Sequence, residues 1–325
     1  MKVARSRGTV LLGRLRQSWA ARSHRSRFIC VLLVLILFIV FSSHRYASYK
    51  MNNTAWAKAP INFIDRECPA TGYPVLGTKG SAGKICITTL TDAKKADPLQ
   101  KMLRWRNFNS LLEMTLPNKE AYAKKHGYYV FDESDSLDTT RPPSWSKIKA
   151  AQRLLTEEDC DWVFWLDADT VVMNSAKTIE SFLPADDTHD LLITAQKGGS
   201  YNAGAWLVRN TEWSREFLQT WWDMKEFVKP KGLSVSGDND ALKAYLLGMD
   251  PDYFHQHILV PPRCTFNSVT VFLPPEEAES MTAEEVKEKD WYMHLEKYHK
   301  GDFIAHVAGK NNKISTTEML LKDAV

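Results

Sequence analysis

The feature that most constrains the fold is a five-residue apolar run, WVFWL at 162–166, that ends directly in Asp167-Ala-Asp169. A continuous apolar run of this length is typical of a strand that is buried on both faces of a sheet. Further short apolar runs alternate with stretches of helical spacing. The predicted strands cover 85–90, 128–131, 162–166, 191–195, 205–208 and 258–260, and the predicted helices cover 99–116, 146–155 and 213–227. This alternation predicts an α/β fold with a mainly parallel sheet, helices on both faces and ligands at the carboxyl ends of the strands.

The amino-terminal region has a different composition. Residues 28–41 (FICVLLVLILFIVF) are all apolar, and residues 1–45 hold nine basic residues and no Asp or Glu. Fourteen residues are few for a membrane span, but tilt and a thin early-secretory bilayer would accommodate them. The positive-inside rule then keeps the amino end in the cytoplasm. We expect a basic tail, an uncleaved signal-anchor helix, a lumenal stem and a folded domain at 1–27, 28–44, 45–83 and 84–325. The alternative is a cleaved signal peptide with an unusually long polar lead.

Charge and cysteine content narrow the function and the compartment. Beyond residue 45 the remaining 33 of the 42 basic residues face 39 acidic ones, a balance of −6, so we expect no nucleic-acid partner. The sequon at Asn52 fits a lumenal position. Four cysteines follow the apolar segment, Cys68, Cys86, Cys160 and Cys264. They allow two disulfides in three pairings, or some buried thiols, and the sequence does not choose between them.

Two carboxylates at a strand end suggest a metal site. Asp-x-Asp occurs four times in this chain, but only Asp167 and Asp169 follow a strand of this quality. Such a pair can hold Mg²⁺ or Mn²⁺, and its alternative is a solvated turn. His306 lies in a second apolar segment, GDFIAHVAG, and an added imidazole favours Mn²⁺ over Mg²⁺. Lys310 and Lys313 follow closely, where a cation could offset phosphate charge. Together these residues predict a diphosphate ligand that completes the metal shell.

Several ordered segments carry a family resemblance. They are YAKKHGYYV (122–130), PSWSKIKAAQRLL (143–155), WVFWLDADTVVMN (162–174), YNAGAWLVRNTEWS (201–214), GDNDAL (237–242), VPPRCTFNS (260–268) and GDFIAHVAGK (301–310). The chain thereby resembles glycosyltransferase family 34 over about residues 84–312. The resemblance implies a single GT-A domain, which is a Rossmann-like mixed sheet with helices on both faces. It further implies a type II membrane protein of the Golgi or another early secretory membrane. It also implies Mn²⁺-dependent, retaining transfer of galactose, mannose or xylose from a nucleotide diphosphate sugar to a glycan on a glycoprotein or polysaccharide.

The resemblance also assigns roles to individual residues. The implied metal ligands are Asp167, Asp169 and His306. The implied donor-binding residues are Thr88, Thr89, Lys147, Asp167, Asn202 and Gly204, and the implied catalytic residues are Asp238, Asn239, Asp240 and Lys310. Two positions depart from the family pattern, since Asn311 replaces a common lysine and Asn239 replaces a common glutamine. The resemblance implies front-face attack in which the leaving phosphate accepts the acceptor's proton, with Asp238 or Asp240 beside the oxocarbenium-like centre.

Two other classes of protein share parts of this pattern. In phosphatases of the haloacid dehalogenase type, Asp167 would be a phosphorylated nucleophile and Asp169 a general acid. However, about eighty residues of strand and helix precede the motif here, whereas those enzymes open their sheet with it. The second alternative is a catalytically inactive lumenal subunit that binds sugars, and the presence of Asp167, Asp169 and His306 argues against it. The sequence leaves open whether the chain assembles with itself or with other chains.

Overall fold

The computed structural model describes residues 82–93, 110–184, 189–196, 200–230, 236–269, 298–309 and 313–325. All of them belong to one compact unit, 60–325. The expected tail and anchor helix, most of the expected stem and Lys310 lie outside these residues. Among the residues described, no helix combines the length and the apolar character needed to cross a membrane.

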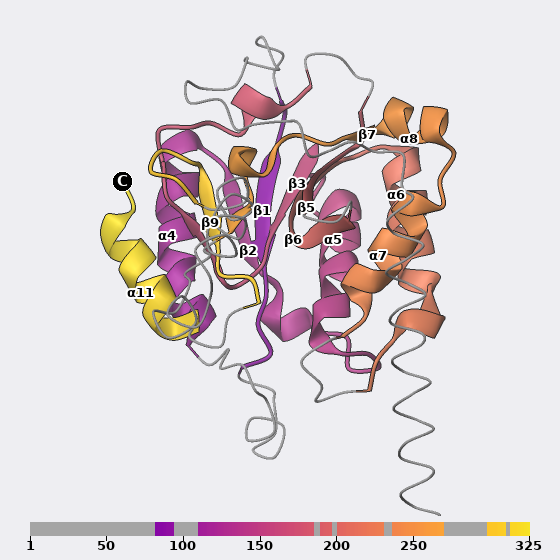
Figure 1. Cartoon of the computed structure of the whole chain (residues 1–325), viewed down its shortest axis with the longest axis horizontal. Helices are drawn as coiled ribbons and strands as arrows, with labels where there is room; N and C mark the ends of the chain where they lie inside the picture. Colours follow the sequence, from indigo (N-terminus) through magenta and orange to yellow (C-terminus); the bar gives the residue numbers. More distant parts are fainter. Residues whose placement is uncertain are drawn as a thin grey trace, which may run out of the picture. The chain divides into compact units, whose positions relative to one another are not determined.

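A six-stranded mixed sheet forms the centre of the fold (Figure 1). Its strands, in spatial order, are β2 (Tyr129–Asp132), β1 (Ile85–Thr89), β3 (Trp162–Leu166), β6 (Ser200–Arg209), β5 (Leu191–Gln196) and β7 (Ile258–Leu259). Strands β1, β2 and β3 are parallel, as are β5 and β7, but β6 runs antiparallel to both of its neighbours. Only residues 197–199 join β5 to β6, which is too short for the crossover that parallel pairing requires. The predicted mixed α/β sheet is therefore confirmed.

A second, three-stranded sheet was not predicted. It contains, in spatial order, β4 (Thr170–Val172), β9 (Ile304–His306) and β8 (Ser268–Val269). Strand β4 begins one residue after Asp169, and it pairs antiparallel with β9 in a register that places Thr170 opposite His306. Strands of two or three residues are too short to show a period in the sequence. This small sheet brings two distant segments together at the carboxyl end of β3.

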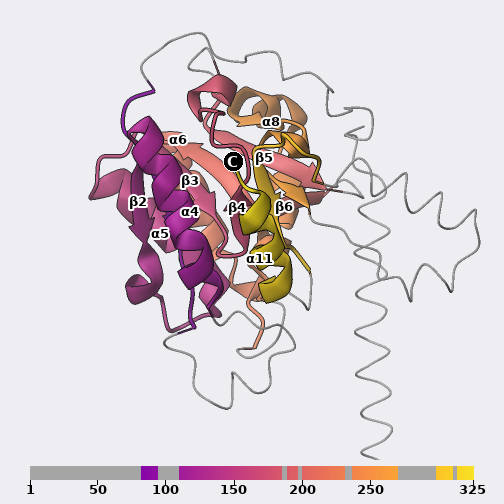
Figure 2. The same ribbon diagram turned by 90° about the vertical axis from the view of Figure 1, so that its left-hand side faces the viewer.

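Helices cover both faces of the main sheet (Figures 1 and 2). Helix α4 (Leu111–His126) covers one face, and α5 (Ser146–Thr156), α6 (Glu212–Asp223) and α7 (Asp238–Leu247) cover the other. Helix α11 (Lys313–Asp323) lies beside α4 and packs against the small sheet. Helix α8 (Pro251–His257) precedes β7. Of the helix predicted over 99–116, residues 99–109 lie outside the described residues, and 111–116 fall in α4, which continues through Pro117 to His126. The helix predicted over 213–227 ends at Asp223 and is followed by a 3-10 turn, η5 (Lys225–Phe227).

The core explains why WVFWL has no polar residue. Val163 and Trp165 pack into the cluster that includes residues of α5, α6 and α7. Trp162, Phe164 and Leu166 pack into the cluster on the opposite face, together with residues of α4. Successive side chains of a strand point to opposite faces, so a strand covered on both sides is apolar at every position.

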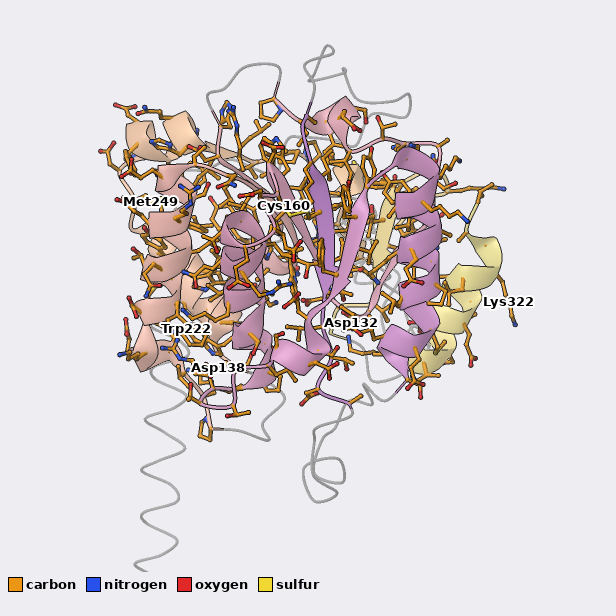
Figure 3. The ribbon with its side chains drawn as sticks, turned by 180° about the vertical axis from the view of Figure 1, so that it is seen from behind. Asp132, Asp138, Cys160, Trp222, Met249 and Lys322 are labelled. Carbon is orange, nitrogen blue, oxygen red and sulfur yellow. A yellow bond between two sulfur atoms is a disulfide. The ribbon has the colours of Figure 1, made fainter. Side chains whose placement is uncertain are left out.

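One disulfide fastens the centre of the sheet. Cys86 in β1 is bonded to Cys160, labelled in Figure 3, just before β3, and the two Cα atoms are 5.9 Å apart. Cys264 is disulfide-bonded as well. The Cys86–Cys160 bridge belongs to only one of the three pairings that the sequence leaves open. Such a bridge is typical of a protein that folds in an oxidising compartment.

Candidate active site

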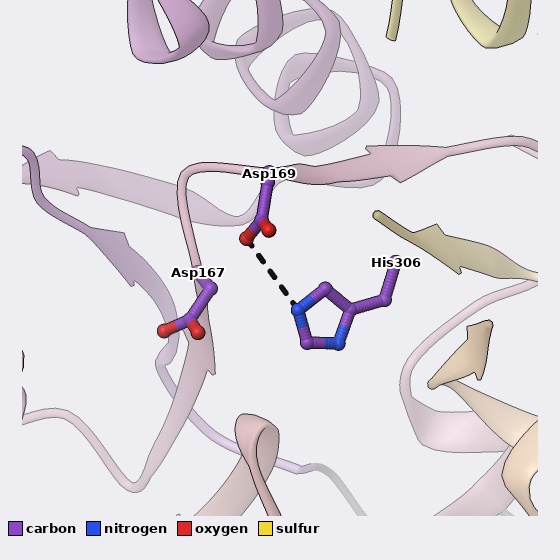
Figure 4. Close-up of side chains that lie close together, drawn as sticks. All are labelled: Asp167, Asp169 and His306. Carbon is purple, nitrogen blue, oxygen red and sulfur yellow. Dashed lines mark ion pairs between the residues drawn. The ribbon is translucent and has the colours of Figure 1, made fainter. Parts of the chain in front are cut away.

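Asp167, Asp169 and His306 converge at the carboxyl end of β3 (Figure 4). One ligand atom from each lies within 4.8 Å of the others. The Nε2 atom of His306 is 3.4 Å from Oδ1 of Asp169. Both Asp169 and His306 are buried, whereas Asp167 is half-buried. The structure therefore brings together the three residues predicted as metal ligands.

Backbone hydrogen bonds hold the Asp-Ala-Asp turn from two sides. The amide of Asp167 donates to the carbonyl of Gly204 in β6 at 2.8 Å. The amide of Val307, next to β9, donates to the carbonyl of Asp169 at 2.9 Å. The turn is thus anchored to both sheets, and this fixes the directions of the two carboxylates.

Lys147 forms an ionic bridge beneath Asp167. Its Nζ lies 3.1 Å from Oδ1 of Asp167, 3.2 Å from Oδ2 of Asp238 and 3.0 Å from the carbonyl oxygen of Ala203. Trp165 Nε1 donates to the same Asp167 oxygen at 2.7 Å. Burial acts to lower the pKa of Lys147, but the attraction of Asp167 and Asp238 outweighs it and raises that pKa. Lys147 is 3% exposed, so the structure shows it holding two acidic residues together rather than as a solvated helix lysine.

Asp169 is balanced by Lys313, the first residue of α11. The Nζ of Lys313 contacts Oδ2 of Asp169, while Oδ1 faces His306. Burial acts to raise the pKa of Asp169, but Lys313 and His306 hold that pKa well below its usual range. In this structure Lys313, which the sequence suggested for a phosphate, is buried against a carboxylate. Lys310 lies outside the described residues.

Two of the predicted donor-binding residues lie in the first half of β6, where its pairing with β5 shifts register. We call this irregular stretch, Asn202–Gly204, the β6 turn. Asn202 Oδ1 accepts a hydrogen bond from the amide of Gly204 at 2.8 Å. A Cβ atom on Gly204 would lie 2.1 Å from Cε1 of His306, so the absence of a side chain makes room for that ring. The predicted catalytic residue Asn239 supports the same turn, because its Oδ1 accepts from the amide of Ala203 at 2.7 Å.

The two predicted catalytic carboxylates of α7 differ in their surroundings. Asp238 is buried, and it accepts from Ser236 and pairs with Lys147. Asp240 is half-buried in the first turn of α7. Burial lowers the pKa of the nearby Lys243, and the Asp240 charge partly opposes that effect. Asp238 is therefore committed to the ionic bridge, and Asp240 is the more accessible of the two.

Thr88 and Thr89 end β1 and are both fully buried. The Thr88 hydroxyl donates to the carbonyl of Phe131 at 3.3 Å. The Thr89 hydroxyl makes no hydrogen bond to another described residue. A buried hydroxyl without a partner is uncommon, and at a strand's carboxyl end it is suited to a ligand.

Three side chains of α4, not identified from the sequence, support β4 and the turn before it. Thr115 donates to the carbonyl of Ala168 at 2.7 Å, and Lys119 Nζ donates to that of Thr170 at 2.7 Å. Asn118 bonds both the amide and the carbonyl of Val172, at 2.8 and 3.0 Å. The accepting carbonyls belong to every second residue, Ala168, Thr170 and Val172. Residues 115, 118 and 119 lie on one face of α4 and can therefore reach them together. Helix α4 thus pairs with the β4 edge as a neighbouring strand would.

Lys119 leads to a prediction about pH. Burial lowers its pKa to about 7, although Asp169 and Asp167 partly oppose the shift. Between that value and the ordinary lysine pKa the unfolded chain binds more protons, so stability rises with pH. We expect the unfolding free energy to rise from pH 7 to 9.5 by about 3 kcal/mol more than it does in Lys119→Met. Urea unfolding of both proteins at both pH values measures this difference. An equal rise in unfolding free energy in wild type and Lys119→Met would contradict the prediction.

The three converging residues suit a divalent cation. Two carboxylates and an imidazole are the donors that Mn²⁺ accepts, and Mg²⁺ prefers oxygen alone. Lys147 and Trp165 both donate hydrogen bonds to Oδ1 of Asp167. Lys313 contacts Oδ2 of Asp169. Each of these two aspartates therefore has one oxygen engaged by the protein and a second that can face a cation.

The sequence also matches a known protein family and several of its members. Residues 82–188 and 176–316 match the galactosyl transferase GMA12/MNN10 family. The chain is 28% identical over 246 residues to the probable alpha-1,6-mannosyltransferase MNN10 of Saccharomyces cerevisiae, covering 65% of this chain and 58% of that protein. It is 25% identical over 255 residues to xyloglucan 6-xylosyltransferase 4 of Arabidopsis thaliana, covering 70% and 46%. It is 29% identical over 206 residues to galactomannan galactosyltransferase 1 of Cyamopsis tetragonoloba, covering 55% and 44%.

The chain thus spans about half the length of the curated relatives it matches. Among solved structures, it is similar to a glycosyltransferase involved in glycosylation of the major capsid of PBCV-1. That similarity has a TM-score of 0.47 and 16% identity, and it covers 73% of this chain and 99% of the other.

Proposed function

Because this chain belongs to the galactosyl transferase GMA12/MNN10 family, we propose that it is a retaining glycosyltransferase. Its donor is a nucleotide diphosphate sugar that carries galactose, mannose or xylose, and its acceptor is a glycan on a glycoprotein or polysaccharide. The observation that carries the proposal is the convergence of Asp167, Asp169 and His306 at the carboxyl end of β3. The relatives named as mannosyl-, xylosyl- and galactosyltransferases support the same reaction class.

Asp167, Asp169 and His306 would hold Mn²⁺, or Mg²⁺ with lower preference because of the imidazole. When bound, the cation offsets the negative charge that develops on the leaving diphosphate. Lys147 and the backbone of β6 keep Asp167 in place, and Lys313 and His306 keep Asp169 ionised. These contacts fix the carboxylates before a donor arrives, as electrostatic catalysis requires.

The donor would lie across the carboxyl ends of β1, β3 and the β6 turn. Thr89 lies at the end of β1, where we place the nucleoside. We place the sugar between the β6 turn and the start of α7. Asp240 is better suited than Asp238 to stabilise positive charge at the reacting sugar, because Asp238 is already paired with Lys147. The leaving phosphate would accept the acceptor's proton in a front-face attack.

We also propose a GT-A domain anchored by residues 28–44 and facing the Golgi lumen. The mixed sheet fits this fold, and the Cys86–Cys160 disulfide supports an oxidising compartment. The two alternatives are less well supported. Asp167 follows the third strand of the described sheet in chain order, whereas the phosphatase motif opens its sheet. An inactive sugar-binding subunit would have no need for a complete set of ligands for a catalytic metal.

The test is a screen of nucleotide sugars with the full chain. We expect Mn²⁺-dependent hydrolysis of one among UDP-galactose, GDP-mannose and UDP-xylose, and faster turnover when the right glycan is added. EDTA should abolish the reaction, and Mn²⁺ should restore it. Binding of a nucleotide sugar without any hydrolysis or transfer would instead support the inactive subunit. Inhibition by beryllium fluoride would support the phosphatase.

A further inference from the structure

We infer that Asn267 is a positioning residue that fixes the tautomer of His306, at the end of a hydrogen-bond chain that starts at the backbone of Gly204. This inference rests on the metal site of the proposed function, but it concerns a residue that neither the metal nor the donor needs to touch. Asn267 is fully buried, and its Oδ1 lies 2.9 Å from Nδ1 of His306.

The hydrogen-bond chain begins at a backbone amide, which can act only as a donor. The backbone amide of Gly204 can only donate, and it lies 2.8 Å from the Oδ1 position of Asn202. That atom must therefore be the carbonyl oxygen of the Asn202 side chain. This assignment settles which way the Asn202 amide faces.

The next link orients Asn267. Its Nδ2 lies 3.3 Å from the Asn202 carbonyl oxygen and 2.9 Å from Oγ1 of Thr194. If the side-chain amide of Asn267 were flipped by about 180°, its oxygen would face the side-chain oxygen of Asn202. Asn267 must therefore direct its amino group to Asn202 and its oxygen to His306.

The last link fixes the imidazole. The Asn267 oxygen can only accept, so Nδ1 of His306 must carry a hydrogen. In the neutral ring Nε2 then has the lone pair, and Nε2 is the atom that lies 3.4 Å from Oδ1 of Asp169. A lone pair and a carboxylate oxygen thus face each other across a space that a cation would fill. Hydrogen bonds of this kind orient metal-binding histidines in many proteins.

The position of Asn267 is itself well defined. Its amide donates to the carbonyl of Arg263 at 2.7 Å, within the turn that follows the 3-10 helix η6 (Arg263–Thr265). The following residue, Ser268, begins β8 and pairs with Ala305 of β9. Oδ1 of Asp169 could also accept a hydrogen from Nε2, but Asp169 is already paired with Lys313. The opposite tautomer of His306 would leave the buried Asn267 oxygen without a hydrogen from the ring, so Asn267 favours the form with the hydrogen on Nδ1.

Binding of Mn²⁺ alone to the full chain, measured by electron paramagnetic resonance, tests the inference. Asn267→Leu has a similar volume but no acceptor, and we expect it to weaken Mn²⁺ binding roughly 10- to 100-fold. Asn267→Asp keeps the acceptor for Nδ1 but places its second oxygen against that of Asn202, so it should lose less Mn²⁺ affinity than Asn267→Leu does. Thr194→Val is the matched control, because it removes a hydrogen bond from the same amide but leaves the acceptor for His306. Its Mn²⁺ affinity should not change.

Nitrogen-15 NMR of labelled histidine reads the tautomer directly, in the absence of metal and at a pH where His306 is neutral. Assigned by comparison with His306→Gln, the wild-type ring should carry its hydrogen on Nδ1. A hydrogen on Nε2 would overturn the inference, even if Asn267→Leu failed to fold. Equal losses of Mn²⁺ affinity in Asn267→Leu and Thr194→Val, or no loss in Asn267→Leu, would also overturn it. Wild type that bound no Mn²⁺ would instead refute the metal site, while the NMR result would still decide the tautomer.

Discussion

Asp169→Asn should lower Mn²⁺-dependent turnover of the nucleotide sugar by at least about 10³-fold, because the Lewis-acid role of a bound cation is worth several kcal/mol. Asn has the shape of Asp but lacks its charge. The change also leaves Lys313 buried beside a neutral amide, where it is paired with a carboxylate in the wild type. Loss of charge therefore weakens the cation site and removes the partner that balances Lys313.

The measurement needs a control for folding. Melting temperature and circular dichroism of Asp169→Asn show whether the fold survives, and turnover is measured well below the melting point. Asp252→Asn is the matched control, because Asp250 and Asp252 have the same Asp-x-Asp spacing but are exposed on α8. This variant should keep wild-type turnover. A folded Asp169→Asn protein with turnover within about threefold of wild type, where loss of the cation should cost several kcal/mol, would refute the metal role of this residue.

The central strands were predictable because their signal is local. WVFWL gave the bounds of β3 correctly, and the runs near Ile85 and Leu191 gave β1 and β5 within one residue. Strand β3 is apolar at every position because helices cover both of its faces. The carboxylates of Asp167 and Asp169 could be placed at the site by the same reasoning, since they follow the strand directly.

The supporting residues could not be predicted, because long-range contacts decide their roles. Lys313 is 144 residues from Asp169 in the sequence, and Asn267 is 39 residues from His306. Lys119 looks like an ordinary helix lysine until the fold buries it behind β4. Lys313, which the sequence suggested for a phosphate, is paired with Asp169 instead, and only the folded structure shows this.

The short strands β4, β8 and β9 have a similar explanation. None of them has enough residues to show a period, and each is stabilised by its partners more than by its own composition. The side chains of Thr115, Asn118 and Lys119 complete the hydrogen bonding of β4. Only the packed structure reveals that α4 is part of the support for the site.

Gly204→Ala should reduce both Mn²⁺ affinity and turnover by roughly 100-fold, because a shift of about 1 Å in a catalytic group can have an effect of this size. The φ of Gly204 lies outside the left-handed region, so its backbone conformation is open to alanine and the obstacle is steric. The new Cβ would lie 2.1 Å from Cε1 of His306 and 2.9 Å from Oδ1 of Asn202. Neither side chain can move away easily, since the His306 ring is buried and Asn202 is hydrogen-bonded to the Gly204 amide.

The ring must therefore move away from Asp169 and from Asn267, and both the cation site and the hydrogen bond to Nδ1 are disturbed together. Gly248→Ala provides the control, because Gly248 is exposed at the end of α7 and its Cβ would lie 3.2 Å from the nearest oxygen. That variant should bind Mn²⁺ as wild type does. If Gly204→Ala kept wild-type Mn²⁺ affinity, the His306 ring would have to bind the cation from a different position, and the geometry described for this site would be wrong. A loss of affinity with an unchanged melting temperature would locate the damage in the site rather than in the fold.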